Sequence, residues 1–289
     1  MTAHIIDGRA IAREMRREVT AEVEEFKAQY GRPPGLAVIL VGDFAPSLYY
    51  VRTKARFCED VGMHSEIHHL PADTPEDQVL DLIERLNTDD NIHGFLVQLP
   101  VPDHIDPLRL QWAISPEKDV DGLHPINVGR LVLGEDCLVP ATPAGIMEAL
   151  RREGIEVQGK RVVIVGRSNI VGKPLFMLMM HAHATPTICH SRTRPLGDVT
   201  REGDILVAAV GVPELIKADM VKPGAVVIDV GVNRVEDETA EKGYRLAGDV
   251  AFDEVKAVAG AITPVPGGVG PLTIAHLLVN NLTAARRQN

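Results

Sequence analysis

The fold of this chain is decided by the stretch VVIVGRSNIVGKP at residues 162–174. Its first four residues are β-branched and predict a buried strand, Gly166 predicts a tight turn, and a helix is expected to follow. Such a turn aims the N–H groups of a helix N-terminus at a phosphate group. The pattern departs from GxGxxG, because Ser168 replaces the second glycine and the last glycine comes one residue late, at Gly172. As a bare pattern it also fits an ordinary strand-to-helix turn.

The next predicted strand ends in CHSRTR, residues 189–194, and this ending favours NADP over NAD. A dinucleotide fold that prefers NAD usually carries an acid about 20 residues after the glycine turn, where it binds the ribose 2′-OH. Here the chain has Ser191 and two arginines, Arg192 and Arg194, and Arg167 in the first turn can join them. Guanidinium groups suit a 2′-phosphate because they form charge-assisted, bidentate bonds. The alternative is a solvated basic loop.

Strands and helices alternate on both sides of this stretch, which predicts a parallel α/β fold. Strands are expected at 36–41, 67–70, 94–99, 187–189, 205–209 and 225–230, and helices near 9–30, 46–61, 75–86, 142–152 and 272–285. The alternation restarts after residues 120–142, so we expect two α/β units with their boundary there. The last helix can pack on either unit, and a return to the first one is a common arrangement.

Composition excludes several classes of protein. The chain has 289 residues, of which 45% are apolar and 24% charged, as in ordinary globular proteins of about two domains. Aromatic residues make up only 4%, too few for a stacking platform for single-stranded nucleic acid. The net charge of −10 disfavours general binding to nucleic acid or to anionic membranes. No apolar run reaches the roughly 18 residues of a membrane span.

The cysteines and histidines indicate neither a disulfide framework nor a metal site. The three cysteines, Cys58, Cys137 and Cys189, are far apart in sequence, which fits a reducing, cytoplasmic compartment. The N-terminus shows no signal-peptide pattern. The 11 histidines lack the spacing with carboxylates that is typical of zinc, so we expect surface or packing roles for them and no bound metal.

Two segments in the first unit carry side chains suited to proton transfer. On a helix over 46–61, Ser47, Tyr50 and Lys54 share one face, and a lysine acts as an acid or base only where its surroundings lower its pKa. The alternative is a surface lysine lying over a tyrosine ring. Gln98 stands at the carboxyl end of a predicted strand, where open α/β sheets bind ligands. Asp121, in PEKDVDG at 116–122, can bind a ring with adjacent N–H donors, or it can cap a turn.

Five strings, taken together, resemble one family in their order and spacing. They are SxxYVxxK at 47–54, GFLVQLP at 94–100, PEKDVDG at 116–122, VGRSxIVGxP at 165–174 and TPVPGGVGP at 263–271. The chain is similar to the bifunctional methylenetetrahydrofolate dehydrogenase/methenyltetrahydrofolate cyclohydrolases from about residue 5 to residue 285. The DVDG and PGGVGP strings are highly specific.

The resemblance implies an activity, a cofactor and an assembly. The activity is NADP-dependent oxidation of 5,10-methylenetetrahydrofolate and hydrolysis of the methenyl product to 10-formyltetrahydrofolate, in one-carbon metabolism. It also implies two domains with a cleft between them and a homodimer formed through the cofactor domains. The folate-binding catalytic domain would comprise residues 1–122 and 270–289, and a Rossmann-like NADP-binding domain residues 140–269, with 123–139 as a connecting segment.

The resemblance also implies roles for single residues. Lys54 would be catalytic in the cyclohydrolase step, with Tyr50 orienting the pterin, Gln98 tuning Lys54 and Asp121 holding the pterin ring. Tyr49 stands beside Tyr50, and the spacing to Lys54 selects Tyr50. The residues implied to bind folate are Tyr50, Lys54, Val97, Gln98, Leu99, Asp121, Pro266, Gly267, Gly268, Val269 and Gly270. Those expected to bind the cofactor are Gly166, Arg167, Ser168, Ser191, Arg192 and Val232.

Three other readings compete with this one. A dehydrogenase without hydrolysis is disfavoured because Lys54, Gln98 and Asp121 are all present. A folate- or nucleotide-binding module without catalysis is disfavoured because Lys54 and the Gly166 turn are both intact. A general NAD(P) oxidoreductase explains residues 160–232 but leaves the strings at 47–54, 94–100 and 263–271 unexplained.

Overall fold

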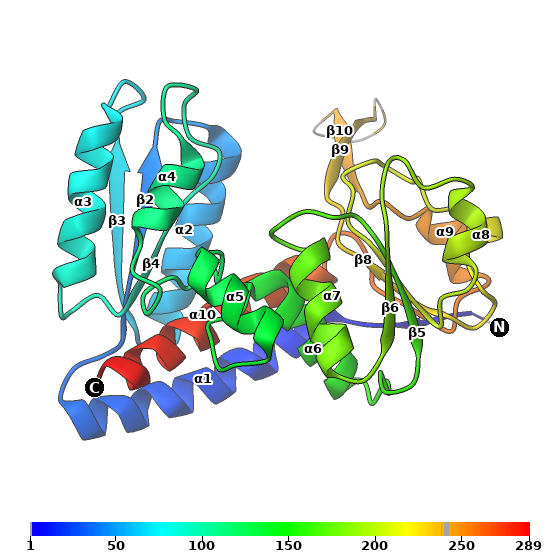
Figure 1. Cartoon of the computed structure of the whole chain (residues 1–289), viewed down its shortest axis with the longest axis horizontal. Helices are drawn as coiled ribbons and strands as arrows, with labels where there is room; N and C mark the ends of the chain where they lie inside the picture. The colour runs from blue at the N-terminus through cyan, green and yellow to red at the C-terminus, as the bar shows by residue number, and fades with distance from the viewer. Residues whose placement is uncertain (1, 238, 240–242) are drawn as a thin grey trace. The chain divides into compact units, whose positions relative to one another are not determined.

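The structure is a computed structural model that describes residues 2–237, 239 and 243–289 (Figure 1). Residues 238 and 240–242, which fall within the predicted NADP-binding domain, lie outside the described part. The chain divides into two compact units. One comprises Glu14–Ala141 and Ile274–Asn289, and we call it the lysine unit because it contains Lys54. The other comprises the chain up to Arg13 and Thr142–Thr273, and we call it the glycine-turn unit because it contains Gly166.

The lysine unit is built on a three-stranded parallel sheet in the order β3-β2-β4. Its strands are β2 (Gly35–Val41), β3 (His64–Leu70) and β4 (Gly94–Val97). Its helices are α1 (Gly8–Tyr30), α2 (Ala45–Asp60), α3 (Glu76–Thr88), α4 (Pro107–Ala113), α5 (Pro125–Leu133) and α10 (Val269–Gln288). The first residues of α1 and α10 belong to the glycine-turn unit.

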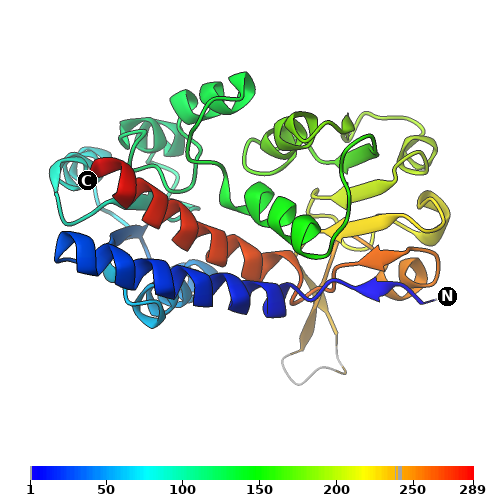
Figure 2. The same ribbon diagram turned by 90° about the horizontal axis from the view of Figure 1, so that it is seen from below.

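The central strand β2 is buried along its whole length, because helices cover both faces of the sheet. Leu36, Val38 and Leu40 share one hydrophobic cluster with residues of α1, α2 and α10. The alternate residues of β2 pack instead against α3 and α4. Figure 2 shows α1 and α10 side by side, and Arg286 on α10 donates a 2.6 Å hydrogen bond to Glu22 on α1.

The glycine-turn unit is built on a six-stranded parallel sheet in the order β1-β11-β8-β7-β5-β6. In chain order the strands are β1 (His4–Ile5), β5 (Arg161–Val165), β6 (Thr185–Cys189), β7 (Ile205–Ala208), β8 (Val226–Asp229) and β11 (Ala261–Ile262). The helices are α6 (Ala141–Arg152), α7 (Gly172–His181), α8 (Leu196–Thr200), η1 (Ala218–Met220) and α9 (Phe252–Lys256). An antiparallel hairpin, β9 (Asn233–Glu236) with β10 (Tyr244–Ala247), stands apart from this sheet.

In the glycine-turn unit, too, the central part of the sheet is buried on both faces. Val163 and Val165 of β5 join a cluster with residues of β7, β8, α8 and α9. Val162 and Ile164 are also fully or almost fully buried, and they point to the opposite face of the sheet. Figure 1 shows α7 on the other side of the sheet from α8 and α9. Strand β5 is therefore apolar on both faces. All strand pairs of this sheet are parallel, and the prediction of a parallel α/β fold is confirmed.

The two ends of the chain pack in different units. From Ile274 onward, α10 belongs to the lysine unit, so the last helix returns to the first part of the chain. The N-terminus differs from the predicted division, which placed it with residues up to 122. His4 and Ile5 pair with Ala261 and Ile262, which adds β1 to the edge of the six-stranded sheet. A strand of two residues is too short to show a pattern in the sequence. None of the helices in the described part of the chain has the length and apolar character that a membrane span requires.

Candidate active site

Helix α2 presents Lys54 toward the carboxyl end of the neighbouring strand β4. Lys54 Nζ donates a hydrogen bond of 3.1 Å to Gln98 Oε1. Gln98 is fixed in turn, because its backbone N–H donates to Ile39 O and its Nε2 donates to Leu99 O. Ser47, about two turns before Lys54 on the same helix, is buried, and its hydroxyl lies 3.4 Å from Leu99 O. The face predicted for α2 therefore meets the predicted strand end.

Burial decides the electrostatics of Lys54. Removal from water lowers the pKa of Lys54 below its ordinary value of 10.5, and the negative charge of Asp121 opposes that shift. Burial raises the pKa of Asp121, and the positive charge of Lys54 opposes that shift in turn. Cys58, one helical turn beyond Lys54, is fully buried, and burial raises the pKa of its thiol to about 12. Burial therefore favours the neutral form of the Lys54 amine and keeps the Cys58 thiol protonated.

Asp121 sits in a turn that is packed tightly on the end of the sheet. The turn begins beside β4, where Phe95 N donates to Lys118 O. A Cβ on Gly94 would lie 2.1 Å from Val120 Cγ1, so only glycine lets the turn approach the strand this closely. Gly122 has φ +67°, and a Cβ there would lie 2.5 Å from Val139 C. The turn that carries Asp121 can therefore pack here only because residues 94 and 122 are glycines.

The same turn is held by polar side chains outside the predicted site. Asp119 accepts hydrogen bonds from His124 N (2.7 Å) and Asn127 Nδ2 (2.9 Å). Asn280 of α10 donates to Val120 O and to Val139 O, both at 2.8 Å. Asp119 belongs to a string that was already noted, but Asn280 comes from a helix 160 residues away, and no local pattern marks it.

The other predicted folate contacts of the lysine unit lie nearby in sequence and differ in exposure. Val97 is partly buried as the last residue of β4, and Leu99 is 45% exposed. Tyr50 is 44% exposed, and its ring centroid lies 6.0 Å from that of the more exposed Tyr49. An exposed ring one helical turn from Lys54 is available for stacking on a flat ligand.

The predicted nucleotide turn has the tight geometry that its glycines suggested. Gly166 has φ +133°, and a Cβ there would lie 2.2 Å from Ala209 O. A Cβ on Gly172, the first residue of α7, would lie 2.1 Å from Gly166 O. Ser168 Oγ accepts from Val171 N at 3.1 Å, directly before the start of α7. The two glycines thus let strand, turn and helix approach closely, as the turn of a dinucleotide-binding fold requires.

The basic residues expected around this turn are exposed and suited to an anionic ligand. Arg167, Ser191 and Arg192 are all exposed, and Ser191 and Arg192 lie two and three residues beyond the end of β6. Val232, beyond the end of β8, is 50% exposed. The strand–glycine–helix cradle together with two exposed arginines fits a dinucleotide that carries a 2′-phosphate, and therefore fits NADP.

The TPVPGGVGP segment belongs to the glycine-turn unit, not to the unit that contains Lys54. At two of its positions the structure shows why the residue is glycine. A Cβ on Gly268 would lie 2.6 Å from Pro264 O, and Gly267 has φ +112° with Arg9 beside it. Val269 and Gly270 already form the first turn of α10, and Pro266 lies just before it. A Cβ on Gly270 would meet nothing within 4 Å, so that position is open.

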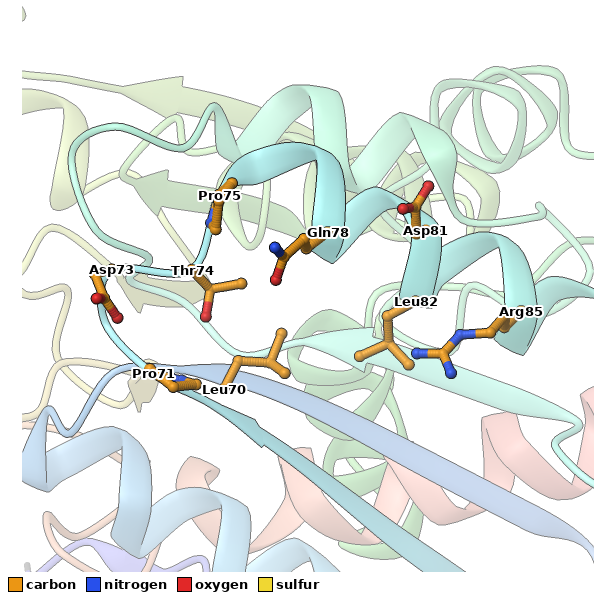
Figure 3. Close-up of a pocket in the computed structure, with 9 residues that line it drawn as sticks. All are labelled: Leu70, Pro71, Asp73, Thr74, Pro75, Gln78, Asp81, Leu82 and Arg85. Carbon is orange, nitrogen blue, oxygen red and sulfur yellow. The ribbon is translucent and has the colours of Figure 1, made fainter.

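One pocket in the lysine unit lies away from these residues (Figure 3). It has a volume of about 660 Å³ and lies between the end of β3 and α3, with Leu70, Gln78 and Arg85 in its wall. No predicted site residue lines it. Of its charged side chains, Asp81 and Arg85 come from α3 and Asp73 from the loop before it, and they converge on no common point (Figure 3). Within the described residues, no three His, Cys, Asp or Glu side chains are grouped so that they could hold a metal ion.

Comparison with known proteins adds an independent line of evidence. Residues 6–121 match the family model of the tetrahydrofolate dehydrogenase/cyclohydrolase catalytic domain. Residues 140–289 match the model of the NAD(P)-binding domain of the same family. A bifunctional protein FolD of Moorella thermoacetica is 57% identical over 287 residues, which cover 99% of this chain and 100% of that protein.

Solved structures agree with these matches. The bifunctional enzyme FolD, a methylenetetrahydrofolate dehydrogenase/cyclohydrolase from Campylobacter jejuni, superposes with a TM-score of 0.95 at 43% identity, covering 99% of this chain and 100% of that one. The corresponding enzyme of Trypanosoma brucei, complexed with NADP and an inhibitor, gives a TM-score of 0.94 at 43% identity, covering 99% and 98%. Both similarities extend over the two units of the chain.

Proposed function

Since this chain belongs to the tetrahydrofolate dehydrogenase/cyclohydrolase family, we propose how its own residues divide the two activities of that family. The chain is a bifunctional enzyme of one-carbon metabolism. It oxidises 5,10-methylenetetrahydrofolate with NADP, and it hydrolyses the methenyl product to 10-formyltetrahydrofolate. The division of labour rests on one observation, the 3.1 Å hydrogen bond from the desolvated Lys54 amine to Gln98.

The dehydrogenase step needs orientation more than proton transfer. Two nitrogens flank the methylene carbon and activate it, so the loss of a hydride requires no separate base. Bound NADP supplies the hydride acceptor. The protein contributes a fixed position for each reactant, and such positioning lowers a reaction barrier by several kcal/mol, up to about 7–11 kcal/mol in the best cases.

The cyclohydrolase step needs a base and then an acid. Water adds to the cationic methenyl carbon, a C–O bond forms, and one proton of that water must leave. The neutral Lys54 amine accepts this proton and returns it to the ring nitrogen as the bond between that nitrogen and the carbon breaks. The remaining hydroxyl proton leaves to solvent as the C=O bond of the formyl group forms. Burial favours the neutral amine, and Gln98 Oε1 holds the amine in place. Asp121 keeps the pKa of Lys54 from falling further.

The remaining site residues bind the two reactants. Tyr50 stacks on the pterin, and the Asp121 carboxylate accepts its N–H groups. Val97, Leu99 and the segment from Pro266 to Gly270 complete the folate contacts. NADP is held by the Gly166 turn with Arg167 and Ser168, by Ser191 and Arg192 at its 2′-phosphate, and by Val232. We assign folate binding to residues 14–122 and 270–289, with contacts from Pro266 onward, and NADP binding to the rest of residues 140–269; the chain up to Arg13 belongs to the glycine-turn unit.

Assembly and location complete the proposal. The chain would act as a homodimer formed through its NADP-binding domains, in a reducing, cytoplasmic compartment. The three cysteines support the compartment, because all are buried and none forms a disulfide.

The test separates the two activities in one variant. Lys54→Met removes the amine and keeps most of the side-chain volume, so we expect hydrolysis of the methenyl substrate to fall by about 10²- to 10⁴-fold. Dehydrogenation with NADP should persist. Lys27→Met is the matched control, because Lys27 lies on α1 and pairs with Glu24 at 2.8 Å; both activities should be unchanged.

The assay follows cofactor reduction and methenyl accumulation separately, with acid quenching to distinguish them, and it is run with NADP and with NAD. Equal loss of both activities in folded Lys54→Met protein would refute the division of labour. Accumulation of the methenyl compound by the unmodified chain would favour a dehydrogenase without efficient hydrolysis.

A further inference from the structure

A second buried carboxylate, outside the site around Lys54, lies beneath the nucleotide turn. Asp249 follows hairpin strand β10 and is completely buried. Its Oδ2 accepts hydrogen bonds from Val210 N (2.6 Å) and Gly211 N (3.0 Å). Its Oδ1 accepts from Asn233 Nδ2 at 2.9 Å. The three groups that bond to this carboxylate are all hydrogen-bond donors, so Asp249 serves here as an acceptor.

The segment that Asp249 holds is the one on which the nucleotide turn packs. Val210 and Gly211 follow Ala209. The carbonyl oxygen of Ala209 lies so close to Gly166 that a Cβ on Gly166 would be only 2.2 Å from it. Ala209 N also donates to Val165 O at 2.8 Å, so residues 209–211 run directly beside the end of β5. A shift of this segment would therefore move the wall of the turn.

The third partner of Asp249, Asn233, connects this carboxylate to the segment that follows β8. Asn233 is the first residue of β9 and comes directly after Val232, the half-exposed residue proposed to contact the cofactor. Asp249 thus joins the ends of β7 and β8, two neighbouring parallel strands, through a single side chain. The carboxyl ends of neighbouring parallel strands form the ligand-binding edge of such a sheet.

A second carboxylate keeps Asp249 in position. Asp229 Oδ1 accepts from Asp249 N at 2.9 Å, and Asp229 Oδ2 accepts from Val250 N at 3.0 Å. Both carboxylates also lie close to glycine backbone: a Cβ on Gly231 would lie 2.2 Å from Asp249 Oδ1, and one on Gly248 would lie 1.7 Å from Asp229 Oδ2. The orientation of the Asp249 side chain is therefore fixed by its surroundings.

We infer that Asp249 is a positioning residue for NADP, which holds residues 209–211 and Asn233 so that the Gly166 turn and Val232 have the spacing the cofactor needs. The inference rests on the proposed function, because it assumes that NADP binds at the Gly166 turn. Asp249 itself touches no reacting atom; it acts through the backbone of the segments it holds.

The hydrogen bonds allow a test by exchange of partners. Asn233→Asp would place a second carboxylate against Asp249. The hydrogen bond from Asn233 Nδ2 to Asp249 Oδ1 would be lost, and two acceptors would face each other. We expect the dissociation constant of NADP to rise by about tenfold or more, equivalent to the loss of one hydrogen bond to a charged group. Adding Asp249→Asn to Asn233→Asp restores a donor and an acceptor at the same two positions, so the double variant should bind NADP within about threefold of the unmodified protein.

A further variant keeps the test informative if Asn233→Asp folds poorly. Asp249→Ala leaves Val210 N and Gly211 N without their acceptor and should weaken NADP binding without a new charge. For each variant NADP binding is measured by fluorescence titration, well below the unfolding temperature, together with KM for both substrates and hydrolysis of preformed methenyltetrahydrofolate. We expect KM for NADP to rise while KM for the folate and the hydrolysis rate stay unchanged.

The outcomes distinguish this inference from the proposed function. If the unmodified protein binds no NADP, the proposed function fails. If it binds NADP and Asp249→Ala binds equally well, Asp249 has no positioning role. If all variants lose thermal stability and hydrolysis in parallel with NADP binding, and the double variant restores nothing, Asp249 serves the fold alone and the inference is overturned.

Discussion

Two neighbouring asparagines on α10 offer a controlled test of what holds the Asp121 turn. Asn280 and Asn281 are both buried, at 4% and 0% exposure. Asn280 Nδ2 donates to Val120 O and Val139 O at 2.8 Å. Asn281 Nδ2 makes only a 3.5 Å contact with Met63 Sδ, and its Oδ1 has no hydrogen-bond partner among the described residues. Asn280→Ala and Asn281→Ala therefore remove the same atoms but different hydrogen bonds.

The difference in stability follows from these contacts. Both variants leave a similar small cavity, so that cost largely cancels. Asn280→Ala also loses two hydrogen bonds, worth about 1 kcal/mol each, and leaves carbonyl groups unpaired at a further cost of at least about 1 kcal/mol. Asn281→Ala removes an oxygen that was already unpaired. We expect Asn280→Ala to be less stable than Asn281→Ala by about 3 kcal/mol, or about 6–12 °C in Tm.

The assay combines thermal unfolding with the hydrolysis of methenyltetrahydrofolate. Because Val120 directly precedes Asp121, release of its carbonyl should also lower the hydrolysis rate of Asn280→Ala at a temperature where the protein is folded. Asn281→Ala should retain that rate. Equal Tm values for the two variants would show that the hydrogen bonds to Val120 and Val139 do not stabilise the turn, and the reasoning would be refuted.

Two more predictions concern the same site. Gly122→Ala should destabilise the protein by several kcal/mol, because a Cβ would lie 2.5 Å from Val139 C. Gly154→Ala, with a similar φ of +65° but nothing within 4 Å of the new Cβ, should cost only about 1–2 kcal/mol, and similar denaturant midpoints would contradict this contrast. The hydrolysis rate should rise with pH toward the pKa of Lys54, which burial sets below 10.5, and Asp121→Asn should shift that rise to lower pH. If Asp121→Asn instead shifts the rise of the hydrolysis rate to higher pH, the group that titrates is not Lys54.

Local patterns were sufficient to predict the parallel α/β alternation, although not the two-residue strand β1. A strand that is apolar on both faces reads as an apolar run, so β2 and β5 could be recognised without their partners. Gly166 and the exposed arginines after β6 could be predicted for a similar reason, since a tight turn and an anion site each demand particular residue types. The pairing of Lys54 with Gln98 was implied by the family resemblance, and the structure places their atoms 3.1 Å apart.

The sequence by itself determined the alternation of strands and helices, the nucleotide turn and the family, because each depends on residues close together in the chain. Only the tertiary structure decided which groups support them. Asn280 reaches Val120 across 160 residues, and Asp249 reaches Val210 across 39. Both were absent from the predicted site, because an asparagine or an aspartate has the same local appearance whether it is solvated or buried against backbone groups. A buried polar side chain is selected by the donors and acceptors around it, and these exist only once distant segments have packed together.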